Sequence, residues 1–108
     1  MERKATLGEF EHHVILAALR LEDEAYTASI LTEVERCTGR EVSAAAVYIA
    51  LRRLEQAGLV RSRLARAQSG ERRERRYVRV TPAGVRLARE ARRRFVRLWD
   101  GLTVVTAE

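Results

Sequence analysis

A chain of 108 residues has the usual length of a single domain and can bury one modest hydrophobic core. Its one cysteine excludes a disulfide framework within the chain and a cysteine-based zinc site. No stretch resembles a signal peptide and no apolar run is long enough to cross a membrane, so we expect a cytoplasmic protein with no membrane partner.

The positive charge is concentrated in one short segment. The net charge is +6, and 20 of the 21 basic residues are arginine. Residues 61–79 contain eight arginines and two glutamates, so this segment carries the whole excess and the rest of the chain is neutral overall. Such a concentration is typical of an element that binds a polyanion. The alternative is an arginine-rich loop that only keeps the protein in solution.

Two helices are predicted in the first forty residues. In residues 7–21 apolar side chains recur at steps of three and four, which places them in one stripe. A second helix is predicted at about 27–37, where Ile30, Val34 and Cys37 share a face; this position favours burial of Cys37. Gly39 follows as a helix stop.

A third helix has clear start and stop signals. Ser43 is a suitable N-cap, Val47 and Leu54 face inward at helical spacing, and Gly58 falls just past the expected end. Three helices of this length joined by short links fit a helix-turn-helix unit.

After this helix the apolar pattern becomes alternating. Residues 59–64 and 76–80 are rich in β-branched and aromatic residues that alternate with arginine, and the link 65–74 is polar and contains glycine. These features predict a β-hairpin. An arginine-rich hairpin directly after a helix-turn-helix unit is the wing of a winged helix.

The last predicted helix starts at Thr81, as N-cap, and Pro82, and runs to about residue 102. Its apolar stripe is longer than a three-helix core of this size can cover, so we expect it to pair with the same helix of a second chain. The expected dimer interface consists of Leu87, Ala91, Phe95, Leu98 and Leu102.

The predicted fold class is therefore α+β, mostly α: a winged helix-turn-helix with a long C-terminal dimerisation helix. We expect residues 1–81 to form the winged helix-turn-helix DNA-binding domain and residues 82–108 to form the dimerisation helix and a tail.

Three blocks of the sequence resemble the PadR family of bacterial winged-helix transcriptional regulators. They are "LGEFEHHVILAAL", "AYTASILTEVERCTGREVSAAAVYIALRRLEQAGLV" and "RRERRYVRVTPAGVRL", and together they span about residues 7–90. The last block is similar to the "(R)RYYRLTPAG" ending of the family's wing. The resemblance implies a homodimeric regulator of the short type, with a single C-terminal helix for dimerisation.

A recognition helix of this kind enters the major groove of double-stranded DNA. Arg52 or Arg53 is expected to take a phosphate or a guanine edge, and the hydroxyl of Tyr48 a phosphate, with packing between helices as the alternative for Tyr48. The expected DNA-facing residues of this helix are Ser43, Ala44, Tyr48, Arg52 and Arg53.

On the wing, Arg72, Arg73 and Arg75 are the best candidates because they lie at or near its tip. We expect them at the flanking minor groove or its phosphates, since arginine inserts well where that groove is narrow. The other reading applies to three further arginines, which would lie on the outer face of the strands and only keep the protein in solution: Arg61, Arg63 and Arg79.

The resemblance also implies an effector site at the dimer centre. Trp99 on the dimerisation helix would line a cleft between subunits and stack on a flat aromatic or cationic small molecule; interface packing is the alternative. Phe10 and Val14 would share this cleft or fill the core.

The leading hypothesis is a sequence-specific DNA-binding repressor on a palindromic operator, released by a small-molecule ligand. The alternative is a winged-helix module that binds protein or RNA without an operator. No Ser/His/Asp arrangement, phosphate-cradling glycine loop or carboxylate pair points to an enzyme. We expect no catalytic residue, no metal and no cofactor.

Overall fold

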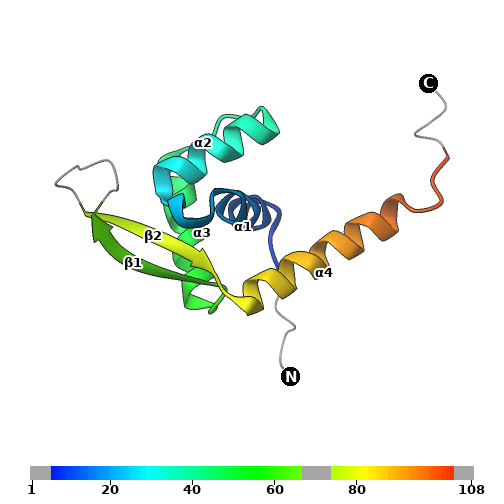
Figure 1. Ribbon diagram of the computed structural model, residues 1–108. Helices are drawn as coiled ribbons and strands as arrows, with labels where there is room; N and C mark the ends of the chain where they lie inside the picture. Colours follow the sequence, from blue (N-terminus) through cyan, green and yellow to red (C-terminus); the bar gives the residue numbers. More distant parts are fainter. Residues whose placement is uncertain (1–5, 67–73, 104–108) are drawn as a thin grey trace.

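The computed structural model describes residues 6–66 and 74–103, which form helices and one β-hairpin. In the view of Figure 1 the hairpin and the last helix extend from a body of three packed helices on opposite sides. The predicted fold class is confirmed. The elements are α1 (Glu9–Leu21), the short 3-10 helix η1 (Glu22–Glu24), α2 (Thr27–Thr38), α3 (Ala44–Gln56), β1 (Val60–Arg66), β2 (Glu74–Val80) and α4 (Pro82–Trp99).

The hydrophobic core lies where α1, α2 and α3 meet the base of the hairpin. Burying one side chain of this kind contributes about 1.5–3 kcal/mol, so the cluster holds α3 and the hairpin in a fixed relation. The largest side chains with less than 2 % of their surface exposed are Val14, Ile15, Ile30, Val47, Leu54 and Val60.

Local signals set the ends of α2 and α3 at the predicted positions. Gly39 ends α2 with a φ of 71°, in the left-handed region that glycine adopts without strain. The Ser43 hydroxyl accepts a hydrogen bond from the Ala46 N–H at 3.0 Å and caps α3. Gly58 has a φ of 76°, and the Leu59 N–H folds back onto the Leu54 carbonyl at 2.8 Å. The end of α2 at Thr38 and the start of α3 at Ala44 leave only a short link between the two helices, as a helix-turn-helix requires.

Two helix boundaries differ from the sequence prediction. α1 starts at Glu9 rather than at residue 7, because Gly8 is its cap and donates its N–H to the Glu11 carboxylate at 3.1 Å. α4 ends at Trp99 rather than near residue 102, because the backbone turns extended at Asp100. Leu102 therefore lies beyond the helix whose stripe it was expected to extend.

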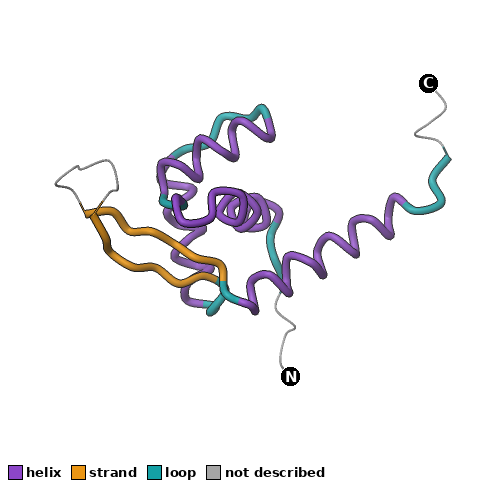
Figure 2. Tube along the Cα trace, in the orientation of Figure 1, coloured by secondary structure: helices purple, strands orange, loops and turns teal. Residues whose placement is uncertain are grey.

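The hairpin is antiparallel, with pairs running from Val60–Val80 to Arg66–Glu74. Each strand is two residues longer than predicted at the end that faces the link. The Val78 N–H donates to the Ala25 carbonyl at 2.9 Å, so the connection between α1 and α2 runs beside β2. Figure 2 shows the hairpin as the only strands among the described residues.

The start of α4 is wedged against the end of α3. The Thr81 hydroxyl accepts from the Gly84 N–H at 3.2 Å, which confirms the predicted cap, and donates to the Gly58 carbonyl at 2.7 Å. A Cβ on Gly84 would lie 2.2 Å from the carbonyl oxygen of Leu59. Only glycine allows this close approach, which fixes the direction in which α4 leaves the body.

Candidate nucleic-acid interface

The outer face of α3 is open along its whole length. Ala45, Ile49, Arg52 and Gln56 follow one another at steps of three and four, and all four are exposed. Ile49 and Gln56 were not among the sequence candidates. Isoleucine is usually a core residue, so its type alone would place Ile49 inside. Only the helical positions of the buried residues of α3 show that Ile49 faces outward.

The predicted residues of α3 are exposed as well. Ser43, Ala44 and Arg53 lie on the surface, and Tyr48 is 50 % exposed, so its ring is not enclosed between helices. The Tyr48 hydroxyl accepts a hydrogen bond from Arg52 Nη1 at 3.4 Å. This hydrogen bond raises the pKa of Arg52 above its usual value, and Arg52 is fully charged at neutral pH.

Two wing arginines are packed on tyrosine rings. The guanidinium carbon of Arg75 lies 4.4 Å from the ring centroid of Tyr26, at the start of α2, and that of Arg63 lies 5.4 Å from Tyr77. The two tyrosines meet edge to face with their centroids 5.6 Å apart. This ladder of rings and guanidinium groups holds the wing against the body.

Of the three arginines predicted for the wing tip, the structure describes only Arg75. Arg75 is half-buried and held against Tyr26, while Arg72 and Arg73 lie outside the described residues. Arg79 is exposed and forms an ion pair with Asp23 of η1.

α4 has an unburied apolar face in its second half. Phe95 and Leu98 are 65 % and 73 % exposed, and Leu102 beyond the helix is exposed too. The first half differs, because Leu87 packs against the core and Ala91 is half-buried. The predicted stripe thus covers the protein's own core at one end and points into solvent at the other.

The three effector candidates occupy different environments. Trp99 is the last residue of α4 and is 52 % exposed. Phe10 is half-buried and lines a hollow between α1 and the link that precedes α3, beside Val42 and Ser43. Val14 has no exposed surface and fills the core, which is the alternative that the sequence left open for it.

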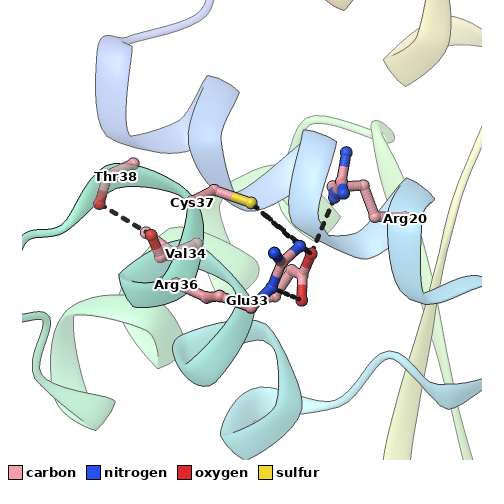
Figure 3. A network of polar contacts seen from close by, with 6 residues as sticks. All are labelled: Arg20, Glu33, Val34, Arg36, Cys37 and Thr38. Atoms are coloured by element: carbon pink, nitrogen blue, oxygen red, sulfur yellow. Dashed lines mark hydrogen bonds and ion pairs between the residues drawn. The ribbon is translucent and has the colours of Figure 1, made fainter.

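A polar network joins α1 to α2 around one carboxylate (Figure 3). Glu33 accepts hydrogen bonds from Arg36 and Arg20, and Cys37 Sγ lies 3.6 Å from the same carboxylate. The bonds from Arg36 and then Arg20 lower the pKa of Glu33 from 4.5 to about 2. Arg20 lies 13 residues before Glu33, so this pair clamps the two helices.

The predicted burial of Cys37 is wrong. The side chain is exposed, because it lies in the last turn of α2, where the helix runs past the core formed with α1 and α3. Its sulfur accepts from Arg36 and donates to the Glu33 carboxylate. It borders an apolar hollow of about 470 Å³ between α1 and α2 to which the exposed Leu16 and Leu19 also contribute.

The depressed pKa of Glu33 predicts a defined pH dependence of stability. A lowered folded-state pKa contributes stability above the unfolded pKa of 4.5, and this is lost as the pH falls from 4.5 towards about 2. The Glu33→Gln variant should therefore unfold more easily than wild type at about pH 6, and the difference should shrink at about pH 3. Urea unfolding at both pH values measures it; an equal difference at both would show that the charge of Glu33 does not contribute.

Within the part of the chain that the structure describes, no three His, Cys, Asp or Glu side chains gather to hold a metal ion. Over the same residues, no helix combines the length and the apolar character needed to span a bilayer.

Three packed helices, a hairpin wing and an open third helix define a winged helix-turn-helix protein. The family model described as "Transcriptional regulator PadR-like family" matches residues 15–90. That is more than half of the sequence, and the chain belongs to the PadR-like family of transcriptional regulators. This is a family of regulators and not of enzymes.

Solved structures share this fold. A PadR family transcriptional regulator from Eggerthella lenta is 29 % identical, with a TM-score of 0.65, and the match covers 87 % of this chain and 80 % of that chain. A PadR-like transcriptional regulator from Bacillus cereus shares the fold at 17 % identity, with a TM-score of 0.74 and 92 % of each chain covered. A transcriptional regulator from Clostridium thermocellum, 24 % identical, has a TM-score of 0.66 with 82 % of each chain covered. A search of curated proteins found no match.

Proposed function

We propose that the protein is a homodimeric repressor that binds a palindromic DNA operator through α3 and the wing. The observation that carries this proposal is the fully open outer face of α3 next to an arginine-rich hairpin. An α-helix is about 10–12 Å across with its side chains, and the major groove of B-DNA is about 12 Å wide. Such a helix fits the groove with its outer face towards the base edges.

Each part of α3 has a role in this proposal. Ser43 and Ala44 start the helix, where N–H groups attract a phosphate and a small side chain permits close approach. Ile49 offers an apolar contact for a thymine methyl group. Tyr48, Arg52 and Arg53 supply donors for phosphates or a guanine edge.

The wing supplies charge beside the helix. Arg72, Arg73 and Arg75 would lie at the flanking minor groove or its phosphates. For Arg75 this requires that its guanidinium leaves the ring of Tyr26 or that DNA approaches the stacked pair. The wing's charge would act on any DNA sequence and so would support affinity more than specificity.

The dimer would form through α4. Phe95 and Leu98 are large apolar side chains left in solvent by a single chain, and a second α4 would cover them. A two-fold dimer presents two α3 helices, which matches a palindromic site with half-sites about one helical turn apart.

The regulatory part of the proposal is repression with release by a small molecule. A dimer on an operator occludes the DNA that it covers. Trp99 would supply a flat surface for an aromatic or cationic effector where two α4 helices meet. Phe10 remains a candidate at the rim, whereas Val14 has no surface to offer.

Fluorescence anisotropy tests the DNA part of the proposal. Labelled DNA from upstream of the protein's own gene is compared with shuffled DNA and with a pool of other promoter fragments at two salt concentrations. A preference of about 1,000-fold or more at moderate salt is the expected result. Equal, salt-sensitive binding to that DNA and to a pool of other promoter fragments would favour the alternative, a winged-helix module that grips polyanions and serves an RNA or protein partner.

A further inference from the structure

A notch lies between the part of α3 that runs from Tyr48 to Gln56 and the wing. It has a volume of about 370 Å³ and is lined by Tyr48, Arg52, Glu55 and Gln56 of α3 and by Arg76 of β2. Arg76 was not among the sequence candidates for DNA binding, because nothing in its local pattern separates it from the other wing arginines. The fold brings it to the same hollow as Arg52, 24 residues earlier in the chain.

The guanidinium groups of the notch are bound to hydroxyl groups. Arg52 donates to the Tyr48 hydroxyl at 3.4 Å, and Arg76 donates to the Ser62 hydroxyl at 3.1 Å. A hydroxyl partner does not neutralise an arginine, so both guanidinium groups can bind an anion; the one carboxylate among the lining residues, that of Glu55, attracts Arg52 through its charge and accepts from Ser62. The Tyr48 oxygen accepts from Arg52, which leaves its own O–H to donate to the same anion.

Arg76 is held in place from α3. The Ser62 hydroxyl donates to the Glu55 carboxylate at 2.7 Å, so its lone pair is directed at Arg76. The chain Glu55–Ser62–Arg76 therefore runs from α3 across β1 to β2. It fixes the guanidinium of Arg76 relative to α3, although the Glu55 carboxylate itself also lines the notch.

The position of the notch indicates which part of the DNA would lie against it. When α3 lies in the major groove and the wing lies over the flanking minor groove, one sugar–phosphate backbone separates the two elements. That backbone must pass the junction of α3 with the wing, which is the notch. Arg52 and Arg76 then approach one phosphate from two elements, the geometry of a clamp.

We propose that Arg52 and Arg76 clamp a single backbone phosphate in each half-site, with Tyr48 as a further donor. Glu55 and Ser62 are positioning residues that act through Arg76. The proposal rests on the proposed DNA-binding function and makes it more specific: Arg52 takes a phosphate and not a guanine edge. The clamp also locks the register of α3 along the groove, because α3 and the wing then hold the same phosphate.

The test pairs protein variants with DNA in which one phosphate at a time is replaced by a neutral methylphosphonate. For wild type, one replacement per half-site should weaken binding about tenfold, the effect of one charge-assisted hydrogen-bond pair. Arg76→Ala and Arg52→Ala should each weaken binding to unmodified DNA by a similar factor. Each variant should lose clearly less affinity than wild type when that same phosphate is neutral, because one of the two arginines that contact it is already gone, and the double variant should lose none.

The positioning of Arg76 has its own readout. Ser62→Ala should show a smaller loss, about threefold, that disappears on the DNA with the neutral phosphate, because it removes the hydroxyl that Arg76 contacts without changing any charge. The matched control is Arg61→Ala, which removes the same charge from the opposite face of the hairpin. It should keep the full sensitivity to the neutral phosphate.

Three results would distinguish a failure of the phosphate clamp from a failure of the proposed DNA-binding function. If Arg52→Ala and Arg76→Ala keep the full wild-type sensitivity at every phosphate, the clamp is wrong while DNA binding stands. If Arg52→Ala instead loses discrimination at one base pair, Arg52 contacts a base and the clamp is also wrong. If wild type binds no DNA at any sequence, the proposed function fails and the clamp with it.

Discussion

Replacing Gly84 by alanine is expected to lower the free energy of unfolding by about 3 kcal/mol, the upper part of the usual range for overpacking. The added Cβ would lie 2.2 Å from the Leu59 carbonyl oxygen and 2.7 Å from a methyl group of Val80. The oxygen belongs to the backbone and cannot rotate away. Alanine also favours a helix over glycine by about 1 kcal/mol, but this gain is smaller than the clash. Thermal and urea unfolding measure the loss.

Gly8→Ala is the matched control for this variant. It adds the same methyl group at a helix start, where the nearest atom is a carboxylate oxygen at the end of the flexible Glu11 side chain. Its cost should stay at or below about 1 kcal/mol, as for a changed N-cap. A Gly84→Ala protein as stable as the control would show that α4 does not need its close contact with Leu59.

A double change of Phe95→Glu and Leu98→Glu should produce a monomer and reduce operator affinity by about 100-fold or more. Both side chains are exposed in the single chain, so the change should leave its core intact. Carboxylates at these positions would face each other across the proposed α4 pair. A monomer then loses the second half-site and the effective concentration that tethering provides, which accounts for the size of the loss.

Arg93→Glu is the control for the α4 double variant. It changes the net charge by the same amount, two units, and at about 100° per residue it lies on the far side of α4 from Phe95. Analytical ultracentrifugation should give a dimer for wild type and Arg93→Glu and a monomer for the double variant. A dimer of the double variant with undiminished operator affinity would place the interface elsewhere than on the exposed end of α4.

The parts of the fold set by local chemistry were predictable from the sequence. Ser43 and Thr81 cap helices because their hydroxyls reach nearby N–H groups, and Gly39 and Gly58 adopt left-handed backbone. The hairpin was predictable because its apolar residues alternate with arginines, and successive side chains of a strand point to opposite faces.

Contacts between distant residues were not predictable in this way. Arg75 stacks on Tyr26, and Arg20 pairs with Glu33, because of how α1, α2 and the wing pack, which no spacing in the sequence encodes. The prediction that Cys37 is buried was wrong for a related reason. Helical spacing shows which face of α2 the residue lies on, but it does not show where along the helix the core ends. The notch that contains Arg76 depends on both packing and register.

The central claim is that two α3 helices of a dimer recognise one two-fold symmetric DNA sequence. Selection of bound DNA from a fully random pool tests this most directly, because it assumes no operator and no gene context. We predict enrichment of a single palindromic motif with half-sites about one helical turn apart, bound by two chains. Enrichment of no motif, or of an asymmetric motif bound by one chain, would contradict the claim.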